Sequence, residues 1–418
     1  DVDSIDLEVD AENVDDFVNS VRYLGPSFGG INLEDIKAPD CFIIEQRLRE
    51  LMDIPVFHDD QHGTAIIAAA GMINALHLTG RDMKSVKVVC NGAGAAGIAC
   101  IELVKAMGIP NDNVILCDTK GVIYKGRGEG MNQWKSTHAV ETEARSLYDA
   151  LKGADVFLGV SAKGALTHDM LRAMAPNPII FAMANPDPEI TPEEAAEVRD
   201  DAIVATGRSD YPNQVNNVLG FPYIFRGALD VQATTINDAM KVACAEALAA
   251  LAREEVPDEV AAAYRGNRPK FGPEYIIPVP FDPRLMSTIP PAVAQAAMDS
   301  GVATRPIEDF EEYQRQLETF VIRSGMTMKP LYERARNTPQ RIIFAEGESR
   351  RVINAVQILV DDGICRPVLL GRPEKIQHIM DQYGLRLNPG ENIDVIDPFN
   401  HPDYDECVDE YYALTCRK

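Results

Sequence analysis

The fold of this chain is decided by residues 86–97, which read Val86-Lys87-Val88-Val89-Cys90-Asn91-Gly92-Ala93-Gly94-Ala95-Ala96-Gly97. A short apolar run is followed by a GxGxxG motif that opens an apolar helical pattern, as in strand–turn–helix units that bind a dinucleotide. The first glycine permits the tight turn, the second lets the backbone approach a pyrophosphate, and the third allows close packing of helix on strand. Free N–H groups at the start of the helix attract the phosphates. The residues that we expect to contact the coenzyme are Gly92, Gly94, Ala95, Ala96 and Gly97.

The choice of coenzyme depends on the end of the next apolar run. Asp118 stands there, where an acid usually meets the adenosine ribose. This acid favours NAD, because a carboxylate would repel the 2′-phosphate of NADP. Three cations follow it closely and could neutralise that phosphate, namely Lys120, Lys125 and Arg127. The residues therefore leave the choice between NAD and NADP open.

The rest of the chain alternates short apolar runs with helical patterns. After residues 86–90, strands are expected at 114–117, 156–158, 179–182 and 203–206. Strands separated by helices predict an α/β fold with a doubly wound, parallel, Rossmann-like sheet. Further helices are expected at 41–52, 62–78, 95–107, 237–255, 291–300 and 307–323, with a strand at 54–58 and an ordered loop at 265–290.

Composition and charge exclude several classes of partner. The 418 residues suggest about two or three domains. A net charge of −24 argues against binding to nucleic acid or to anionic membranes, and no apolar run reaches the ~20 residues that cross a bilayer.

The eight cysteines show no CxxC pairing, and Cys90, Cys100 and Cys117 lie in apolar runs as buried thiols. A reducing cytoplasm is the expected compartment.

Two acidic pairs precede the glycine motif. Glu34-Asp35 and Asp59-Asp60 each end an apolar run, where a strand edge would aim them at a cleft. An isolated acidic pair is usually a solvated turn, but two pairs beside glycine turns favour a site for a hard divalent cation, Mg²⁺ or Mn²⁺. His58 and His62 lack the HExxH arrangement of zinc enzymes, so structural hydrogen bonding or helix capping is expected for both.

Several motifs in order resemble the malic enzymes of the large bacterial type. The resemblance begins with Phe28-Gly29-Gly30-Ile31-Asn32-Leu33-Glu34-Asp35 and Phe57-His58-Asp59-Asp60-Gln61-His62-Gly63-Thr64-Ala65. It continues through the glycine motif, Ala184-Asn185-Pro186, residues 206–217 and 271–278, and ends near residue 303.

This resemblance implies oxidative decarboxylation of (S)-malate to pyruvate and CO₂, with NADP expected ahead of NAD. Glu34, Asp35 and Asp60 match the family's metal ligands, and Asp59 matches the carboxylate that orients a catalytic lysine. The asparagines that hold malate near the nicotinamide correspond to Asn185 and Asn217, with Asn216 adjacent, and Asn185 is also expected to contact the coenzyme. In the family, the catalytic Tyr and Lys lie before the position of Asp1. We therefore expect a chain truncated at both ends that lacks this proton-transfer pair.

The C-terminal part resembles a second family. Residues 340–348 and 368–373 are similar to the start of phosphate acetyltransferases, and this likeness suggests an acetyl-CoA sensor or, more simply, an oligomerisation module. The expected domains are a malic domain remainder at 1–57, a coenzyme domain at 58–303, a helical linker at 304–337 and the partial acetyltransferase-like domain at 338–418. A homo-oligomer is expected.

Two other classes of protein stay open at this point. One is a metal-independent, NAD-linked hydroxy-acid dehydrogenase, against which the acidic pairs argue. The other is a non-catalytic regulatory protein that responds to acyl-CoA.

Overall fold

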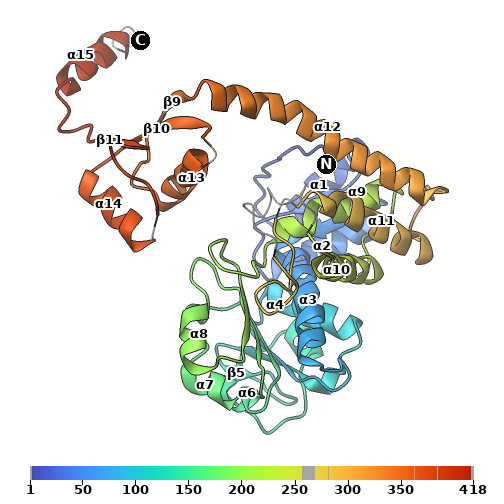
Figure 1. Cartoon of the computed structure of the whole chain (residues 1–418). Helices are drawn as coiled ribbons and strands as arrows, with labels where there is room; N and C mark the ends of the chain where they lie inside the picture. Colours follow the sequence, from blue (N-terminus) through green and yellow to red (C-terminus); the bar gives the residue numbers. More distant parts are fainter. Residues whose placement is uncertain (1, 257–268, 281, 362, 384, 416–418) are drawn as a thin grey trace. The chain divides into compact units, whose positions relative to one another are not determined.

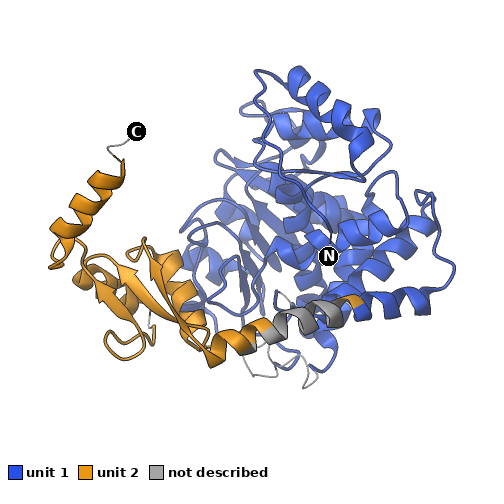
Figure 2. Ribbon diagram, turned by 90° about the horizontal axis from the view of Figure 1, so that it is seen from above, with its two compact units in different colours: residues 1–319 blue, residues 320–418 orange. Residues whose placement is uncertain are grey.

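The computed structural model describes residues 2–256, 269–280, 282–361, 363–383 and 385–415 (Figure 1). The chain forms two compact units, residues 1–319 and 320–418 (Figure 2).

A six-stranded sheet forms the centre of the first unit. Its strand order is β5-β4-β3-β6-β7-β8, and every neighbouring pair is parallel except β4 and β5. The order reverses between β3 and β6, and sheets of this kind bind their ligands at the carboxyl ends of the strands beside such a reversal. The predicted doubly wound α/β fold is confirmed. The strands are β3 (Val88–Asn91), β4 (Val114–Asp118), β5 (Gly121–Val122), β6 (Val156–Gly159), β7 (Ile179–Ala182) and β8 (Ile203–Thr206).

Helices cover both faces of this sheet (Figure 1). On one face, Phe157 and Ile180 are buried in a core that includes Leu151 and Leu171 of the covering helices. On the other face, Phe181 lies against Gly71 of α3. Alternate residues of a strand point to opposite faces, so these buried runs require helices on both sides. The first face carries α6 (Leu147–Leu151), α7 (His168–Ala173) and α8 (Pro192–Val198), and the second carries α3 (Asp59–Thr79) and α4 (Ala95–Ala106).

A smaller sheet precedes the central one. Its two parallel strands, β1 (Ile31–Leu33) and β2 (Val56–His58), are joined through α2 (Asp40–Leu51). Buried Val18 of α1 (Val14–Leu24), with Leu48 of α2, closes an apolar core on this sheet.

The helices at the end of the first unit differ from expectation in one place. α11 (Arg284–Asp299) packs on α9 (Phe221–Asp230) and α10 (Asp238–Arg253) and begins inside the expected loop 265–290. The loop prediction is therefore wrong from Arg284 on, and residues 265–268 and 281 lie outside the described residues. Pro290 and Pro291 lie inside this helix although proline lacks an N–H donor. Buried Ile289 and Val293 hold the helix together despite them.

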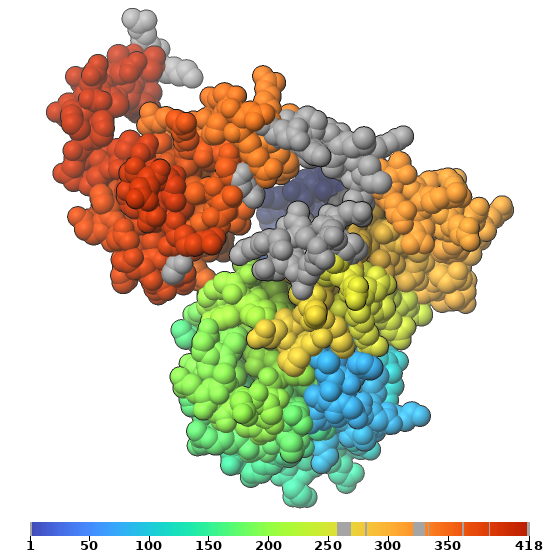
Figure 3. Space-filling view, viewed as in Figure 1, coloured from blue at the N-terminus to red at the C-terminus, as the bar shows by residue number. Residues whose placement is uncertain are grey.

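The segment 270–280 is held against α3. Asn74 is fully buried and donates to the carbonyls of Ala249 (2.9 Å) and Ile276 (2.8 Å). His77 also contacts the ring of Phe271. Figure 3 shows the surface of residues 270–280, in yellow, directly beside that of α3, in blue.

The second unit repeats the strand–helix pattern on a smaller scale. Its parallel sheet has the order β11-β10-β9, and Ile353, Val356 and Leu369 lie in its core. The expected strand–helix–strand start is confirmed. The elements are β9 (Gln340–Phe344), α13 (Arg350–Asp361), β10 (Cys365–Leu370), α14 (Pro373–Gln382), β11 (Asp394–Ile396) and α15 (Tyr404–Thr415), and α12 (Phe310–Asn337) begins in the first unit.

Cys90, Cys100 and Cys117 are buried free thiols, as predicted. Burial raises the pKa of Cys100 and that of Cys117 to about 12, so neither is a thiolate nucleophile near neutral pH. Within the described residues, no helix is both long and apolar enough to span a bilayer.

Candidate active site

The two acidic pairs meet because two strands are paired in register. Leu33 at the end of β1 lies opposite His58 at the end of β2. The residues that follow are Glu34-Asp35 on one strand and Asp59-Asp60 on the other. The backbone N–H of Asp35 donates to Oδ2 of Asp60 at 3.1 Å, and Asp35 adopts a left-handed backbone conformation (φ 56°).

Asp59 is the most enclosed of these acids. It begins α3, earlier than the expected start at residue 62, and is 7% exposed. Asn217 Nδ2 donates to its Oδ2 at 3.2 Å, whereas Oδ1 has no hydrogen-bond partner among the described residues. Burial, reinforced by the negative charge of Glu34, raises the pKa of Asp59 to about 7. Burial and the neighbouring acid therefore make the ionised form of Asp59 costly in this site.

Asn217 connects the acids to the central sheet. It begins the short helix η3 (Asn217–Leu219), and its Oδ1 accepts from Thr64 Oγ1 at 3.1 Å. Two residues earlier, the N–H of Val215 donates to the carbonyl of Thr206, the last residue of β8, at 2.7 Å. The acids thus lie near the carboxyl edge of the sheet, the edge that also carries the glycine loop.

Glu34 is the second of these acids whose pKa is raised. Burial raises the pKa of Glu34, and repulsion from Asp60 and Asp35 adds to the rise, although a 2.6 Å hydrogen bond from Asn32 opposes it. Across the described residues, no three His, Cys, Asp or Glu side chains already stand as a metal-coordinating group. The carboxylates are adjacent but have not converged on one point.

The two histidines have structural surroundings. His62 Nε2 lies 2.7 Å from Glu45 Oε1 inside the core, which matches the predicted structural hydrogen bond. His58 stands at the N-cap of α3 but makes no side-chain capping bond, so the capping prediction is wrong for His58.

The glycine loop has the expected geometry. Gly92 has φ 122°, and a Cβ at Gly97 would lie 1.7 Å from the Gly92 carbonyl oxygen, so only glycine allows this close packing. Gly94 is the N-cap of α4 and supplies no side-chain capping bond, which leaves the first N–H groups of α4 open to an anion.

A residue that the sequence did not reveal joins the loops after β6 and β7. Glu189 is fully buried and accepts from Ser161 N (2.7 Å), Ser161 Oγ (3.0 Å) and Ala184 N (3.1 Å). Ala184 immediately precedes Asn185, one of the expected malate ligands. Glu189 belongs to the loop after β7, and only the fold brings it to Ser161, 28 residues earlier.

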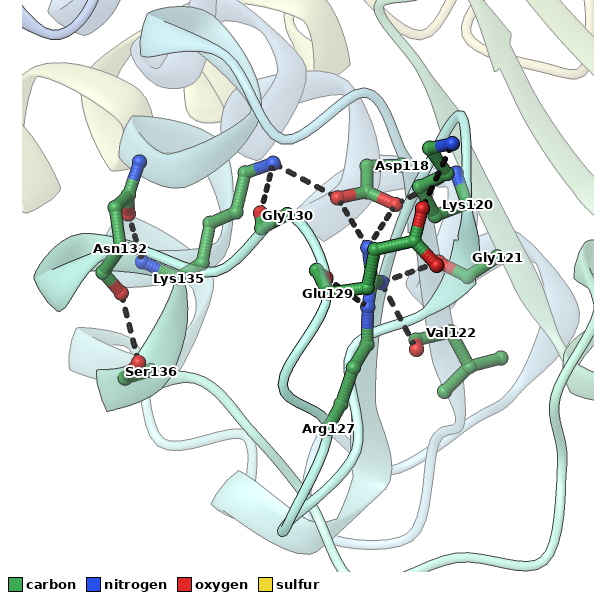
Figure 4. Close-up of polar contacts among 10 residues, drawn as sticks. All are labelled: Asp118, Lys120, Gly121, Val122, Arg127, Glu129, Gly130, Asn132, Lys135 and Ser136. Carbon is green, nitrogen blue, oxygen red and sulfur yellow. Dashed lines mark hydrogen bonds and ion pairs between the residues drawn. The ribbon is translucent and has the colours of Figure 1, made fainter.

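Asp118 ends β4 as predicted, but its surroundings differ from the expectation of a free ribose acceptor. Arg127 and Lys135 both bind its carboxylate (Figure 4). Of the cations expected to neutralise a 2′-phosphate, Arg127 binds the carboxylate of Asp118, while Lys120 pairs with Glu129 at 2.8 Å. Lys135 was missed, since nothing in its local sequence links it to Asp118.

Family models and a solved structure agree on the relationship of this chain. The model "Malic enzyme, N-terminal domain" matches residues 5–49, "Malic enzyme, NAD binding domain" matches residues 61–263, and "Phosphate acetyl/butaryl transferase" matches residues 326–418. The crystal structure of malic enzyme from Pyrococcus horikoshii is 39% identical, with a TM-score of 0.67, and the match covers 75% of this chain and 72% of that one. This chain belongs to the malic enzyme family.

Two curated malic enzymes of Rhizobium meliloti are similar over most of the chain. An NADP-dependent malic enzyme is 70% identical over 93% of this chain, and an NAD-dependent malic enzyme is 53% identical over 100% of it. The chain spans about half the length of these relatives, 51% and 54%. Glu34 and Asp35 fall in the malic enzyme N-terminal match, whereas Asp118 and Asn217 fall in the malic enzyme NAD-binding match.

Proposed function

We propose that this chain carries the metal- and coenzyme-binding part of an enzyme that oxidatively decarboxylates (S)-malate to pyruvate and CO₂ and reduces NADP or NAD. The observation that carries the proposal is the meeting of Glu34, Asp35, Asp59 and Asp60 at the ends of β1 and β2. Asn217 joins this cluster to the sheet edge of the glycine loop. A metal-independent dehydrogenase would have no use for four adjacent carboxylates.

The donor set suits a divalent cation. Glu34, Asp35 and Asp60 would hold Mg²⁺ or Mn²⁺, which prefer oxygen ligands. The raised pKa of Glu34, caused by burial and by its acidic neighbours, shows an electrostatic cost that a cation would offset. When bound, such a cation polarises the malate hydroxyl and stabilises the negative charge that develops as CO₂ leaves.

The protein's own residues bind and orient the substrate. Asn185, Asn216 and Asn217 would hold malate through amide hydrogen bonds close to the nicotinamide. Asp59 would position a lysine through Oδ1, the oxygen that has no partner among the described residues. That lysine would take the hydroxyl proton, and a tyrosine would return a proton to the enol product, as the resemblance implies.

Calorimetry with Mn²⁺ and malate tests this proposal on the 418-residue chain. We expect Mn²⁺ to bind and malate to bind only in its presence, with Asp60→Asn weakening Mn²⁺ by about tenfold or more because one anionic ligand is lost. The matched control is Asp169→Asn, a change at an exposed ion pair on α7. Malate binding that survives EDTA would support the metal-independent dehydrogenase instead, and unchanged Mn²⁺ binding in Asp60→Asn would contradict the assignment of Asp60 as a ligand.

For the second unit, we propose a regulatory response to acetyl-CoA. Its support is the match of residues 326–418 to a phosphate acetyl/butaryl transferase model. Acetyl-CoA should raise the melting temperature of the chain in a concentration-dependent way, since a ligand that binds only the native state stabilises it. No shift, together with an oligomer by light scattering, would favour the oligomerisation module.

A further inference from the structure

Glu189 is a buried carboxylate that the proposed reaction does not use. Its Oε1 accepts from the N–H and the Oγ of Ser161 at 2.7 and 3.0 Å, and its Oε2 accepts from the N–H of Ala184 at 3.1 Å. No cation in the described part of the chain forms an ion pair with this fully buried side chain. Because a buried carboxylate is costly unless its oxygens are hydrogen-bonded, these three donors determine where it lies.

The fold makes room for this carboxylate at the end of β6. A Cβ at Gly159, the last residue of β6, would lie 2.5 Å from Cδ of Glu189 and 2.7 Å from its Oε1, closer than real Cβ contacts come. The next residue, Ile190, is buried in the core beneath α7 and α8. Glu189 is therefore held both by the strand end under its carboxylate and by the core beside its backbone.

Ser161 extends this contact to the glycine loop. Its Oγ accepts from Nδ2 of Asn91 at 2.9 Å, and Asn91 ends β3 and directly precedes Gly92. The N–H of Val160 donates to the carbonyl of Asn91 at 3.0 Å, and a Cβ at Gly92 would lie 2.4 Å from the carbonyl oxygen of Val160. The start of the glycine loop is thus packed directly on the chain that carries Ser161.

Ala184 extends the contact in the other direction, to an expected malate ligand. The N–H of Met183 donates to the carbonyl of Gly159 at 2.9 Å, so the chain follows β6 up to this point. Among the described residues, the next N–H, that of Ala184, is held by Glu189 alone. Asn185 follows directly and is exposed, so the position of its side chain depends on the bond that Glu189 accepts.

We propose that Glu189 is a positioning residue that fixes Asn185 relative to the glycine loop, so that a ligand on the loop favours the binding of malate. Hydrogen bonds lead from the start of the glycine loop through Ser161 and Glu189 to Ala184. A ligand that orders one end of this connection reduces the entropy that the second ligand must lose at the other end. The inference rests on the proposed function and adds to it a dependence of malate binding on the coenzyme loop.

ADP and malate test the role of Glu189 without catalysis. ADP carries the diphosphate that a glycine loop binds, but it has no nicotinamide, the group beside which Asn185 is expected to lie. Calorimetry on the 418-residue chain with Mn²⁺ should show that saturating ADP tightens malate binding by about fivefold or more. Malate must then tighten ADP binding by the same factor, which is an internal check on the measurement.

Glu189→Gln separates positioning from stability. A carboxamide has one acceptor oxygen and one donor group, so the variant can keep the bonds from Ser161 but turns a donor toward the N–H of Ala184. We expect the coupling factor to fall to about one, while ADP alone binds with unchanged affinity. The matched control is Lys163→Gln, which breaks an exposed ion pair with Asp187 (3.3 Å) between the same two loops and should keep the factor.

Ser161→Ala cuts the same connection on the side of the glycine loop. It removes the hydroxyl that joins Asn91 to Glu189 and should also reduce the coupling factor. If both residues act through one connection, the double variant with Glu189→Gln loses no more coupling than the more affected single variant. Losses that add up in the double variant would contradict a single connection.

Hydrogen exchange gives a second readout that does not need malate. ADP should slow exchange in residues 183–187 of the parent and of Lys163→Gln, but not of Glu189→Gln. The inference is overturned if Glu189→Gln keeps the coupling factor or the protection, or if the parent shows neither effect. Failure of the wider function would look different: malate would not bind with Mn²⁺, while ADP would still protect residues 183–187 through Glu189.

Discussion

Leu33 and His58 are register partners in two parallel strands, and this one pairing brings together acids that are far apart along the chain. The backbone N–H of Asp35 binds Asp60 across the strand ends, so the loop after β1 is fixed by the first turn of α3. The position of the acids is therefore a property of the backbone. Substitutions nearby should therefore shift the acids by steric contact or by a change in packing.

Gly63→Ala should destabilise the protein and displace Asp59. A Cβ at this position would lie 2.1 Å from Asp59 Oδ1 and 3.0 Å from Cγ of Asn217, so one of these groups must move. Overpacking of this kind costs about 1–3 kcal/mol. Urea denaturation measures the loss. Gly128→Ala, where a Cβ meets nothing within 4 Å, should change stability by less than about 0.5 kcal/mol.

Glu189→Ala should cost about 2–4 kcal/mol of unfolding free energy, because the N–H groups of Ser161 and Ala184 would lose their buried acceptor. We expect Glu189→Gln to cost less, since its carbonyl oxygen can still accept from Ser161. Denaturation curves compare the three proteins. Equal stability of Glu189→Ala and the parent would show that water replaces the carboxylate at no cost.

Asn74→Ala should loosen the segment 270–280 from α3. Asn74 donates to the carbonyls of Ala249 and Ile276 and accepts from Arg253 Nε at 2.6 Å, and it is fully buried. Three hydrogen bonds disappear, so a loss of about 2–4 kcal/mol is expected. Hydrogen exchange should rise in residues 270–280. Asn111→Ala, at an exposed position in the short helix η2 (Asn111–Asn113), serves as the neutral comparison.

Asp118 should make stability depend on pH in the acidic range. Its pKa in the folded protein lies below the ordinary 3.8, so the folded state holds its proton less tightly than the unfolded state does. The stabilisation is complete above about pH 4 and is lost as pH falls through the folded pKa. The stability difference between the parent and Asp118→Asn should therefore shrink on acidification. A difference that stays constant with pH would contradict this.

The sequence predicts the parts of the fold that have a local signal. The strands from Val88 to Thr206 are continuous apolar runs, as expected when helices cover both faces, and Gly92 and Gly97 mark their turn because no other residue fits. α11 was partly missed because Pro290 argues locally against a helix, while the packing that overrides it involves α9 and α10.

The same distinction between local sequence signals and long-range contacts applies to the site. The two acidic pairs, Glu34-Asp35 and Asp59-Asp60, are visible in the sequence. The register of β1 and β2 explains why they lie close together. Glu189 and Lys135 carry no motif, since Glu189 binds Ser161, 28 residues earlier, and Lys135 binds Asp118, 17 residues earlier. The sequence indicates that Asp118 ends a strand, but only the structure shows that its oxygens are already occupied.

The contacts that Arg127 and Lys135 make with Asp118 also restrict the order in which these three residues can change during evolution. Asp118 and Arg127 are 9% and 5% exposed, so loss of Asp118 leaves the buried charge of Arg127 without its partner. Loss of Asp118 alone would leave two adjacent cations that repel each other. A lineage that changes this corner must therefore pass through an unfavourable intermediate or replace several residues together, and we expect Asp118, Arg127 and Lys135 to be inherited as a set.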